Sequence, residues 1–274
     1  MLRLALAVVM LAFLGSCSTI PMAPAKSTET NLAAVVAQLA PTGKLRAAIN
    51  FGNPVLAARD AATGEARGVS VDLARELGRR LGVPVELVTY DAAGKVFDAL
   101  KSGAWDVAFL AIDPVRAAEI SYSAPYVVIE GAYLVPRDSL IRSNADVDRA
   151  GVRVAVGTGS AYDLYLSREL KQATLVRTPV SGEVADMFVA QKLEVRAGVK
   201  QQLEADARRI PGLRLLEGRF MVINQAMGTP RGREAGARYV HDFIEKMKAS
   251  GFVASSLARN HVEGAAIAPA GDAR

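Results

Sequence analysis

Three polar loops carry the side chains of this sequence that could bind a ligand, and each loop follows a short apolar run. The first is the turn Asp113-Pro114-Val115-Arg116. The guanidinium group of Arg116 offers paired donors that match a carboxylate, and each charge-assisted hydrogen bond contributes about 1.5–3 kcal/mol. Because most isolated arginines that follow a strand lie on the surface, Arg116 indicates an anion site only together with the other loops.

The second loop, Gly157-Thr158-Gly159-Ser160, stands between an apolar run and a helical pattern. Its backbone N–H groups and the hydroxyls of Thr158 and Ser160 can hold an anion at the start of a helix. The same residues fit equally well a turn in which Ser160 caps the helix. A dinucleotide-binding loop does not fit, because Tyr162 stands where the third glycine would be.

The third loop runs from Asn50 to Pro54. Asn50 and Asn53 can donate to a ligand, and they are equally common as plain turn residues. Two histidines, His241 and His261, are too few for a metal site. No Ser–His–Asp or Cys–His arrangement can be assembled from the sequence. We therefore expect a binding site without metal or cofactor.

The elements around these loops alternate between strands and helices. Leucines at every fourth position predict a helix that Ser70 caps and Gly82 closes. Asp91 is expected to cap the next helix, and Glu234 to Ala249 has the apolar stripe of a long helix. This alternation predicts an α/β fold with largely parallel sheets. Since ligands bind beyond the carboxyl ends of such strands, the three loops should meet in a cleft between two lobes.

The N-terminus has the pattern of an export signal. A single Arg3 precedes an apolar run that is too short to span a bilayer, which takes about 20 residues. We expect a signal peptide over 1–16, lipidation of Cys17, and a flexible tether over 17–42. Cleavage near Ala23 or Ala25 is the alternative; the preference for Cys17 rests on its being the only cysteine, which also rules out an internal disulfide. The formal charge of +5 is spread without a basic block, so no nucleic-acid partner is expected.

Four further stretches, in order, resemble the polar-amino-acid type of bacterial extracellular solute-binding proteins, family 3. They are Gly68-Val69-Ser70-Val71-Asp72-Leu73-Ala74, Leu100-Lys101-Ser102-Gly103-Ala104-Trp105-Asp106, Asp113-Pro114-Val115-Arg116 and Tyr122-Ser123-Ala124-Pro125-Tyr126. The resemblance implies a two-lobed periplasmic-binding-protein fold of type II (a Venus flytrap) with a hinge. The boundaries it suggests are 43–134 with 221–262 for the first lobe, 135–220 for the second, and 263–274 for a disordered tail.

The resemblance also implies roles for single residues. Arg116 takes the place of the arginine that binds the ligand's carboxylate, and Asp113 replaces the usual threonine of that turn. Thr158 and Ser160 would hold the same carboxylate from the second lobe, and Phe51 would place its ring against the ligand. Lys200 falls close to the acid that holds an amino acid's ammonium. A lysine there would repel an ammonium and suit a second carboxylate or a keto group. The alternative is that Glu130 or Asp113 supplies the missing negative charge.

The leading hypothesis is the periplasmic binding component of an ABC uptake transporter. It would act as a monomer, capture an amino acid or related organic acid, and deliver it to an inner-membrane permease. A second hypothesis is a dehydratase of cyclohexadienyl acids, in which Glu130 or Asp113 would be the general acid. A third is a ligand sensor for a separate membrane partner.

Overall fold

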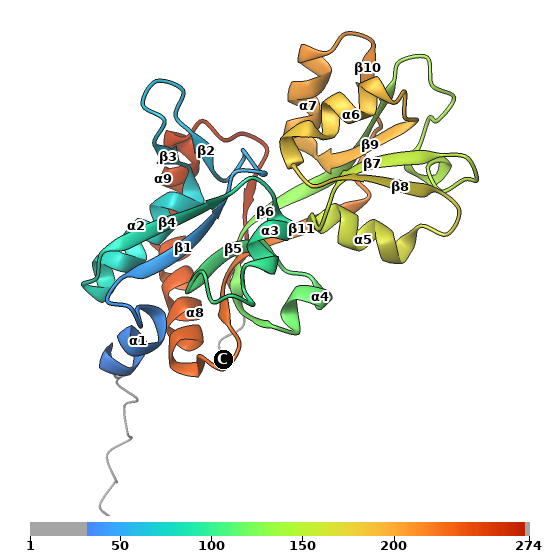
Figure 1. Ribbon diagram of the computed structural model, residues 1–274. Coiled ribbons are helices and arrows are strands. Elements are labelled where there is room, and N and C mark those ends of the chain that lie inside the picture. Colours follow the sequence, from blue (N-terminus) through green and yellow to red (C-terminus); the bar gives the residue numbers. More distant parts are fainter. Residues whose placement is uncertain (1–31, 272–274) are drawn as a thin grey trace, which may run out of the picture.

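The computed structural model describes residues 32–271, and these form two lobes joined by one continuous sheet (Figure 1). The strand order is β4-β1-β5-β11-β6-β9-β7-β8, with β10 and β12 pairing on β6. Parallel pairs occupy the two ends, β4-β1-β5 and β9-β7-β8, whereas β11 and β6 are antiparallel to their neighbours. The two long antiparallel strands therefore connect two parallel α/β units.

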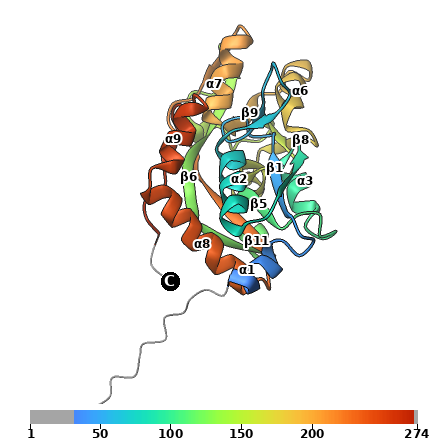
Figure 2. The same cartoon turned by 90° about the vertical axis from the view of Figure 1, so that its left-hand side faces the viewer.

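The first lobe contains both ends of the described chain. Helices α2, α8 and α9 cover one side of its sheet, and α1 packs at the end of α8 (Figure 2). Its elements are α1 (Leu32–Leu39), β1 (Leu45–Asn50), β2 (Ala58–Arg59), β3 (Ala66–Arg67), α2 (Val69–Leu81), β4 (Val85–Tyr90), α3 (Ala93–Asp98), β5 (Val107–Ala111), α4 (Pro114–Ala117), β6 (Ile120–Pro136), β11 (Met221–Pro230), α8 (Glu234–Ala249), α9 (Phe252–Arg259) and β12 (Ala266–Ile267).

The second lobe is made from the middle of the chain and the far end of β6. It has two apolar clusters, one on each face of β7 and β9. Its elements are η1 (Asn144–Asp146), β7 (Arg153–Gly157), α5 (Ala161–Glu169), β8 (Thr174–Thr178), η2 (Ser181–Glu183), α6 (Val184–Ala190), β9 (Val195–Val199), α7 (Lys200–Arg209) and β10 (Leu213–Leu215). The expected lobe boundaries at 134/135 and 220/221 stay predictions.

A buried carboxylate ties the first lobe together. Asp106, at the start of β5, accepts hydrogen bonds from the backbone and guanidinium of Arg46 and from Nη1 of Arg233 at 2.9–3.1 Å. Asp106 has no exposed surface, so these bonds supply the charge compensation that a buried carboxylate needs. They join β1, β5 and the segment before α8.

Two expected helix caps are wrong. Helix α2 begins at Val69 with Gly68 before it, and Ser70 is buried with its Oγ 3.1 Å from the hydroxyl of Tyr126. Helix α3 begins at Ala93, and Asp91 instead pairs with Lys95. In both cases the polar side chain has a tertiary or i,i+4 partner, which replaces the bond to the helix N-terminus. The predicted end of α2 at Gly82 and the span of α8 are confirmed.

Parts of the expected tether and of the expected disordered tail have regular structure. Residues 32–39 form α1, because Val35 and Leu39 bury fully against the first lobe. In the tail, β12 pairs with Val127 and Val128 of β6, and Ala268 is buried. The signal peptide, Cys17 and the expected tether up to residue 31 lie outside the described residues. Within residues 32–271, no helix is both long and apolar enough to cross a membrane.

Candidate functional site

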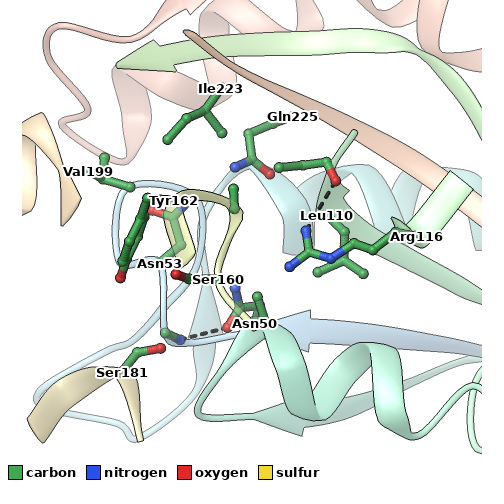
Figure 3. Close-up of a pocket in the computed structure, with 14 residues that line it drawn as sticks. Asn50, Asn53, Leu110, Arg116, Ser160, Tyr162, Ser181, Val199, Ile223 and Gln225 are labelled. Atoms are coloured by element: carbon green, nitrogen blue, oxygen red, sulfur yellow. Dashed lines mark hydrogen bonds between the residues drawn. The ribbon is translucent and has the colours of Figure 1, made fainter. Parts of the chain in front are cut away.

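A cavity lies between the lobes, at the carboxyl ends of strands from both (Figure 3). Its empty space is about 410 Å³, counted with the solvent at its mouth. The three expected loops each contribute residues to it, which agrees with the placement of ligand sites at strand ends. The lining residues are Asn50, Gly52, Asn53, Ala93, Leu110, Ala111, Arg116, Ser160, Ala161, Tyr162, Ser181, Val199, Ile223 and Gln225.

Arg116 is 1% exposed and sits in the short helix α4 at the cavity wall. Its Nη1 donates to the carbonyl oxygen of Ala111 at 3.1 Å, and its Nη2 donates across the cleft to the carbonyl oxygen of Gly159 at 2.6 Å. Its Nε has no partner among the described residues. Burial lowers the pKa of the guanidinium, while the nearby Tyr122 hydroxyl and Asp113 carboxylate raise it. Arg116 is thus a buried cation that carbonyl oxygens hold in place.

Asp113 fixes the turn from outside the cavity. Its Oδ1 accepts from the backbone N–H of Val115 at 2.9 Å, and its Oδ2 accepts from Nη2 of Arg168 on α5 at 2.8 Å. The second bond is an ion pair between the lobes. Asp113 was expected to touch the ligand, but its carboxylate is engaged by Arg168 and does not line the cavity.

The loop formed by residues 157–160 of the second lobe lies in close contact with α3 of the first lobe. A Cβ on Gly94 of α3 would lie 2.7 Å from the carbonyl oxygen of Thr158. Gly159 has φ of +65°, and a Cβ there would lie 2.7 Å from Cα of Gly94. The two glycines therefore permit the backbone approach that brings the Gly159 carbonyl to Arg116.

Ser160 lines the cavity and also caps α5, because its Oγ accepts from the backbone N–H of Asp163 at 3.0 Å. Both interpretations of this residue from the sequence are thus compatible with its position. Asn50 lines the cavity while its Oδ1 accepts from the N–H of Gly52 at 2.9 Å. Asn53 lines it too, and its buried Oδ1 has no partner in the described part of the chain.

Two other expected ligand contacts face elsewhere. The hydroxyl of Thr158 donates to the carbonyl oxygen of Thr178 at 3.1 Å, and Thr158 is not among the lining residues. Phe51 borders a separate open hollow, where the guanidinium of Arg59 lies 4.6 Å from its ring centre. The ring is thus engaged in a cation–π contact, and its expected contact with a ligand stays a prediction.

Lys200 does not line the cavity, although the residue before it in the sequence does. It begins α7, and its Nζ pairs with Oε2 of Glu130 at 3.2 Å. The last residue of β9, Val199, lines the cavity instead. Because the direction of the side chain changes where the strand gives way to the helix, a difference of one residue exchanges a cation for an apolar side chain.

Several lining residues were not identified from the sequence. Ser181 follows the end of β8, so the strand-end rule could have found it. Gln225 is a buried polar residue of β11, 6% exposed, and it lies two positions after Ile223 on the same face of that strand. Tyr162 is the second residue of α5, and burial raises the pKa of its hydroxyl. Within residues 32–271 no cluster of His, Cys, Asp and Glu could hold a metal ion.

Solved structures with the same two-lobed architecture confirm the expected fold class. A mutant of ArgBP from T. maritima superimposes with a TM-score of 0.72 at 21% identity, covering 84% of this chain and 100% of that one. A solute receptor for L-cysteine of Neisseria gonorrhoeae gives 0.73 at 20% identity, covering 84% and 94%. An ancestral amino acid-binding protein, a precursor of cyclohexadienyl dehydratase, gives 0.69 at 21% identity, covering 82% and 97%.

A search of curated protein sequences finds no match. A family model, in contrast, matches residues 45–260, which include the turn of Arg116, the loop before α5 and both long strands between the lobes. The match covers more than half of the chain and confirms the resemblance seen in the four motifs. The chain belongs to the bacterial extracellular solute-binding proteins, family 3.

Proposed function

We propose that this protein is the binding component of an ABC uptake transporter and captures a small carboxylate in the cavity between its lobes. The protein would work in the periplasm as a monomer, tethered through a lipidated Cys17, and deliver its ligand to an inner-membrane permease. The family and the neighbouring structures, whose names include amino-acid-binding proteins, support this role.

The main observation behind this proposal is that Arg116 is buried and has no carboxylate partner among the described residues. A buried cation without a carboxylate partner is costly, and a ligand carboxylate would supply the missing negative charge. The unpartnered Nε and the second hydrogen on each Nη of Arg116 are donors still available for such a ligand. Since Ser160 and Gly159 come from the other lobe, one ligand bound here would contact both lobes and stabilise their closure.

The test is a titration of small carboxylates followed by calorimetry and by thermal unfolding. A ligand that binds the folded state at 100 times its Kd adds about 2.7 kcal/mol to the stability. Arg116→Met should lose at least one charge-assisted bond of about 1.5–3 kcal/mol, which weakens binding about tenfold or more. Arg149→Met is the matched control, because Arg149 is an exposed arginine of the second lobe. Unchanged affinity in Arg116→Met would remove this residue from the site.

The dehydratase hypothesis lacks its acid in the cavity. Neither Glu130 nor Asp113 lines it, and both accept hydrogen bonds from arginines. The Arg219 guanidinium and the Lys200 ammonium also lower the pKa of Glu130, which makes it a poorer proton donor at neutral pH. We therefore propose binding without turnover. Incubation with prephenate or arogenate checks this, and formation of the dehydrated product would contradict it.

A further inference from the structure

We propose that the ligand is a small hydroxycarboxylate rather than an α-amino acid, an inference that rests on the proposed function of the same cavity. The cavity combines one buried cation with amide, hydroxyl and apolar groups. It would accept an anion whose other polar groups are uncharged, and reject one that carries an ammonium.

The charges of the cavity wall come from a single residue. Among the lining residues of the described chain, Arg116 is the one charged side chain. The N-terminus of α5 also meets the cavity at Ser160 and Ala161 and adds a partial positive charge. An ammonium placed here would lose its hydration without gaining a carboxylate partner, which is strongly unfavourable.

Acidic side chains adjacent to the cavity are engaged by other groups. Four lie within two positions of a lining residue, and each bonds to a partner outside the lining set. Asp91 pairs with Lys95, Asp113 with Arg168, Asp163 with Arg177, and Glu183 accepts from the hydroxyl of Thr178. None of the four lines the cavity.

The end of β9 is where a carboxylate that could pair with a ligand ammonium was expected, and no acidic side chain stands there. Val199 is 9% exposed and packs with the core of the first lobe, so the cavity wall there is apolar. The next residue, Lys200, is directed to Glu130 and adds no acid. An ammonium near Val199 would meet methyl groups, whereas a hydrocarbon portion of the ligand would gain from the same contact.

The remaining polar groups suit a neutral donor. The Oδ1 of Asn53 is buried and unpartnered within residues 32–271, so it can accept one hydrogen bond from the ligand. A hydroxyl can donate that bond and can also accept from the amide of Gln225 or the hydroxyl of Ser181, which line the same cavity. A keto oxygen would leave Asn53 Oδ1 unsatisfied, at a cost of about 1–3 kcal/mol. These contacts favour a hydroxy acid over a keto acid, and the lack of an acidic side chain among the lining residues of the described chain favours it over an amino acid.

Matched pairs that differ only in the α-substituent test this directly. Calorimetry with L-lactate against L-alanine, L-2-hydroxyisovalerate against L-valine, and L-phenyllactate against L-phenylalanine compares hydroxyl with ammonium on one skeleton. We expect the hydroxy acid of the best-binding pair to bind at least tenfold tighter than its amino acid. Val199→Asp should reverse that preference, and Val189→Asp, at an exposed position of the same lobe, should leave it unchanged.

The preference of the unaltered protein decides the inference even if Val199→Asp does not fold. Equal or tighter Arg116-dependent binding of the amino acids would overturn the hydroxycarboxylate inference and leave the proposed function standing. If no pair binds, mass spectrometry of the copurifying small molecule decides: a hydroxy acid without a basic nitrogen supports the inference, and an acid that has an ammonium or lacks a hydroxyl overturns it. Failure of every carboxylate to bind, with nothing copurifying, overturns the proposed function itself.

Discussion

Two buried arginines, one in each lobe, have very different surroundings. Arg116 of the first lobe and Arg196 of β9 in the second are 1% and 5% exposed, and each has an Nε without a partner in the described residues. Arg196 forms an ion pair with the equally buried Asp206 of α7. Arg116 instead bonds to two backbone carbonyl oxygens, one of them on the opposite lobe.

Under the proposed function, the difference separates a structural cation, Arg196, from a binding cation, Arg116. Arg196 carries its counterion inside its own lobe, so its charge is compensated whatever the position of the other lobe. Arg116 has Asp113 three residues away, but Arg168 engages that carboxylate. In the proposed function, the remaining compensation for Arg116 comes from a ligand that enters the cleft, so that the ligand becomes part of the charge balance of the site.

The strongest test of this contrast removes the counterion of Arg196. Asp206→Ala leaves a buried guanidinium without a carboxylate and should cost about 3–5 kcal/mol of unfolding free energy. Replacing both partners, as Arg196→Met with Asp206→Leu, should restore most of the stability, because well-packed apolar residues often substitute for a buried pair. Urea unfolding of both variants gives the comparison. A loss below about 1 kcal/mol in Asp206→Ala would mean that this pair behaves like a surface pair.

A second test separates Arg116 from its partner across the cleft. In Gly94→Ala the new Cβ would approach the Thr158 carbonyl to 2.7 Å, so the lobes must move apart. Overpacking of this kind costs about 1–3 kcal/mol in the closed form, and each 1.4 kcal/mol weakens ligand binding tenfold. Calorimetry measures the affinity, and Gly182→Ala is the control because its Cβ would meet nothing within 4 Å. Unchanged affinity in Gly94→Ala would show that the ligand does not need this closed contact.

The sequence predicted the positions of the strand ends better than the contacts of single side chains. Periodicity and the turn-rich loops placed Asn50, Arg116 and Ser160 at one cleft, and the structure brings all three to the cavity. The strand β9 was also predicted, but the residue at its end that lines the cavity is Val199, whereas Lys200 begins α7 and pairs with Glu130. A difference of one residue matters here because the direction of the side chain changes where the strand gives way to the helix.

Other errors arise where a tertiary partner decides the role of a residue. Nothing local distinguishes the capping role expected of Ser70 from its buried contact with Tyr126, since that partner is 56 positions away. The same applies to Asp113, whose partner Arg168 is on the other lobe. The composition of residues 263–274 predicted a disordered tail. Part of it pairs with β6 because that strand has a free edge there, and composition gives no information about strand edges.

A third test asks whether the charge of Arg116 contributes to stability at all. Arg116→Met removes two bonds to carbonyl oxygens and also removes the desolvation cost that lowers the pKa of this guanidinium. We expect these effects to offset, so that the ligand-free unfolding free energy changes by no more than about 1 kcal/mol. Urea unfolding beside Asp206→Ala provides the measurement. A loss as large as that of Asp206→Ala would make Arg116 a structural cation like Arg196.

The smallest effect is expected where an arginine pairs at the surface. Glu130 accepts from Arg219 at 2.7 Å and from Lys200 at 3.2 Å, and the two cations lower the pKa of its carboxyl from 4.5. A carboxyl whose pKa is lowered on folding stabilises the protein above its ordinary pKa, and that contribution disappears as the pH falls through the folded value. Glu130→Gln should therefore cost about 0.2–1 kcal/mol at pH 7, and the cost should decrease progressively as the pH falls below 4.5. Urea unfolding across this pH range measures the loss. A double-mutant cycle with Arg219→Met gives the interaction energy of the pair. A loss above about 3 kcal/mol would place this exposed pair in the same class as Arg196 and Asp206, and burial would then not explain the difference between the arginines of this protein.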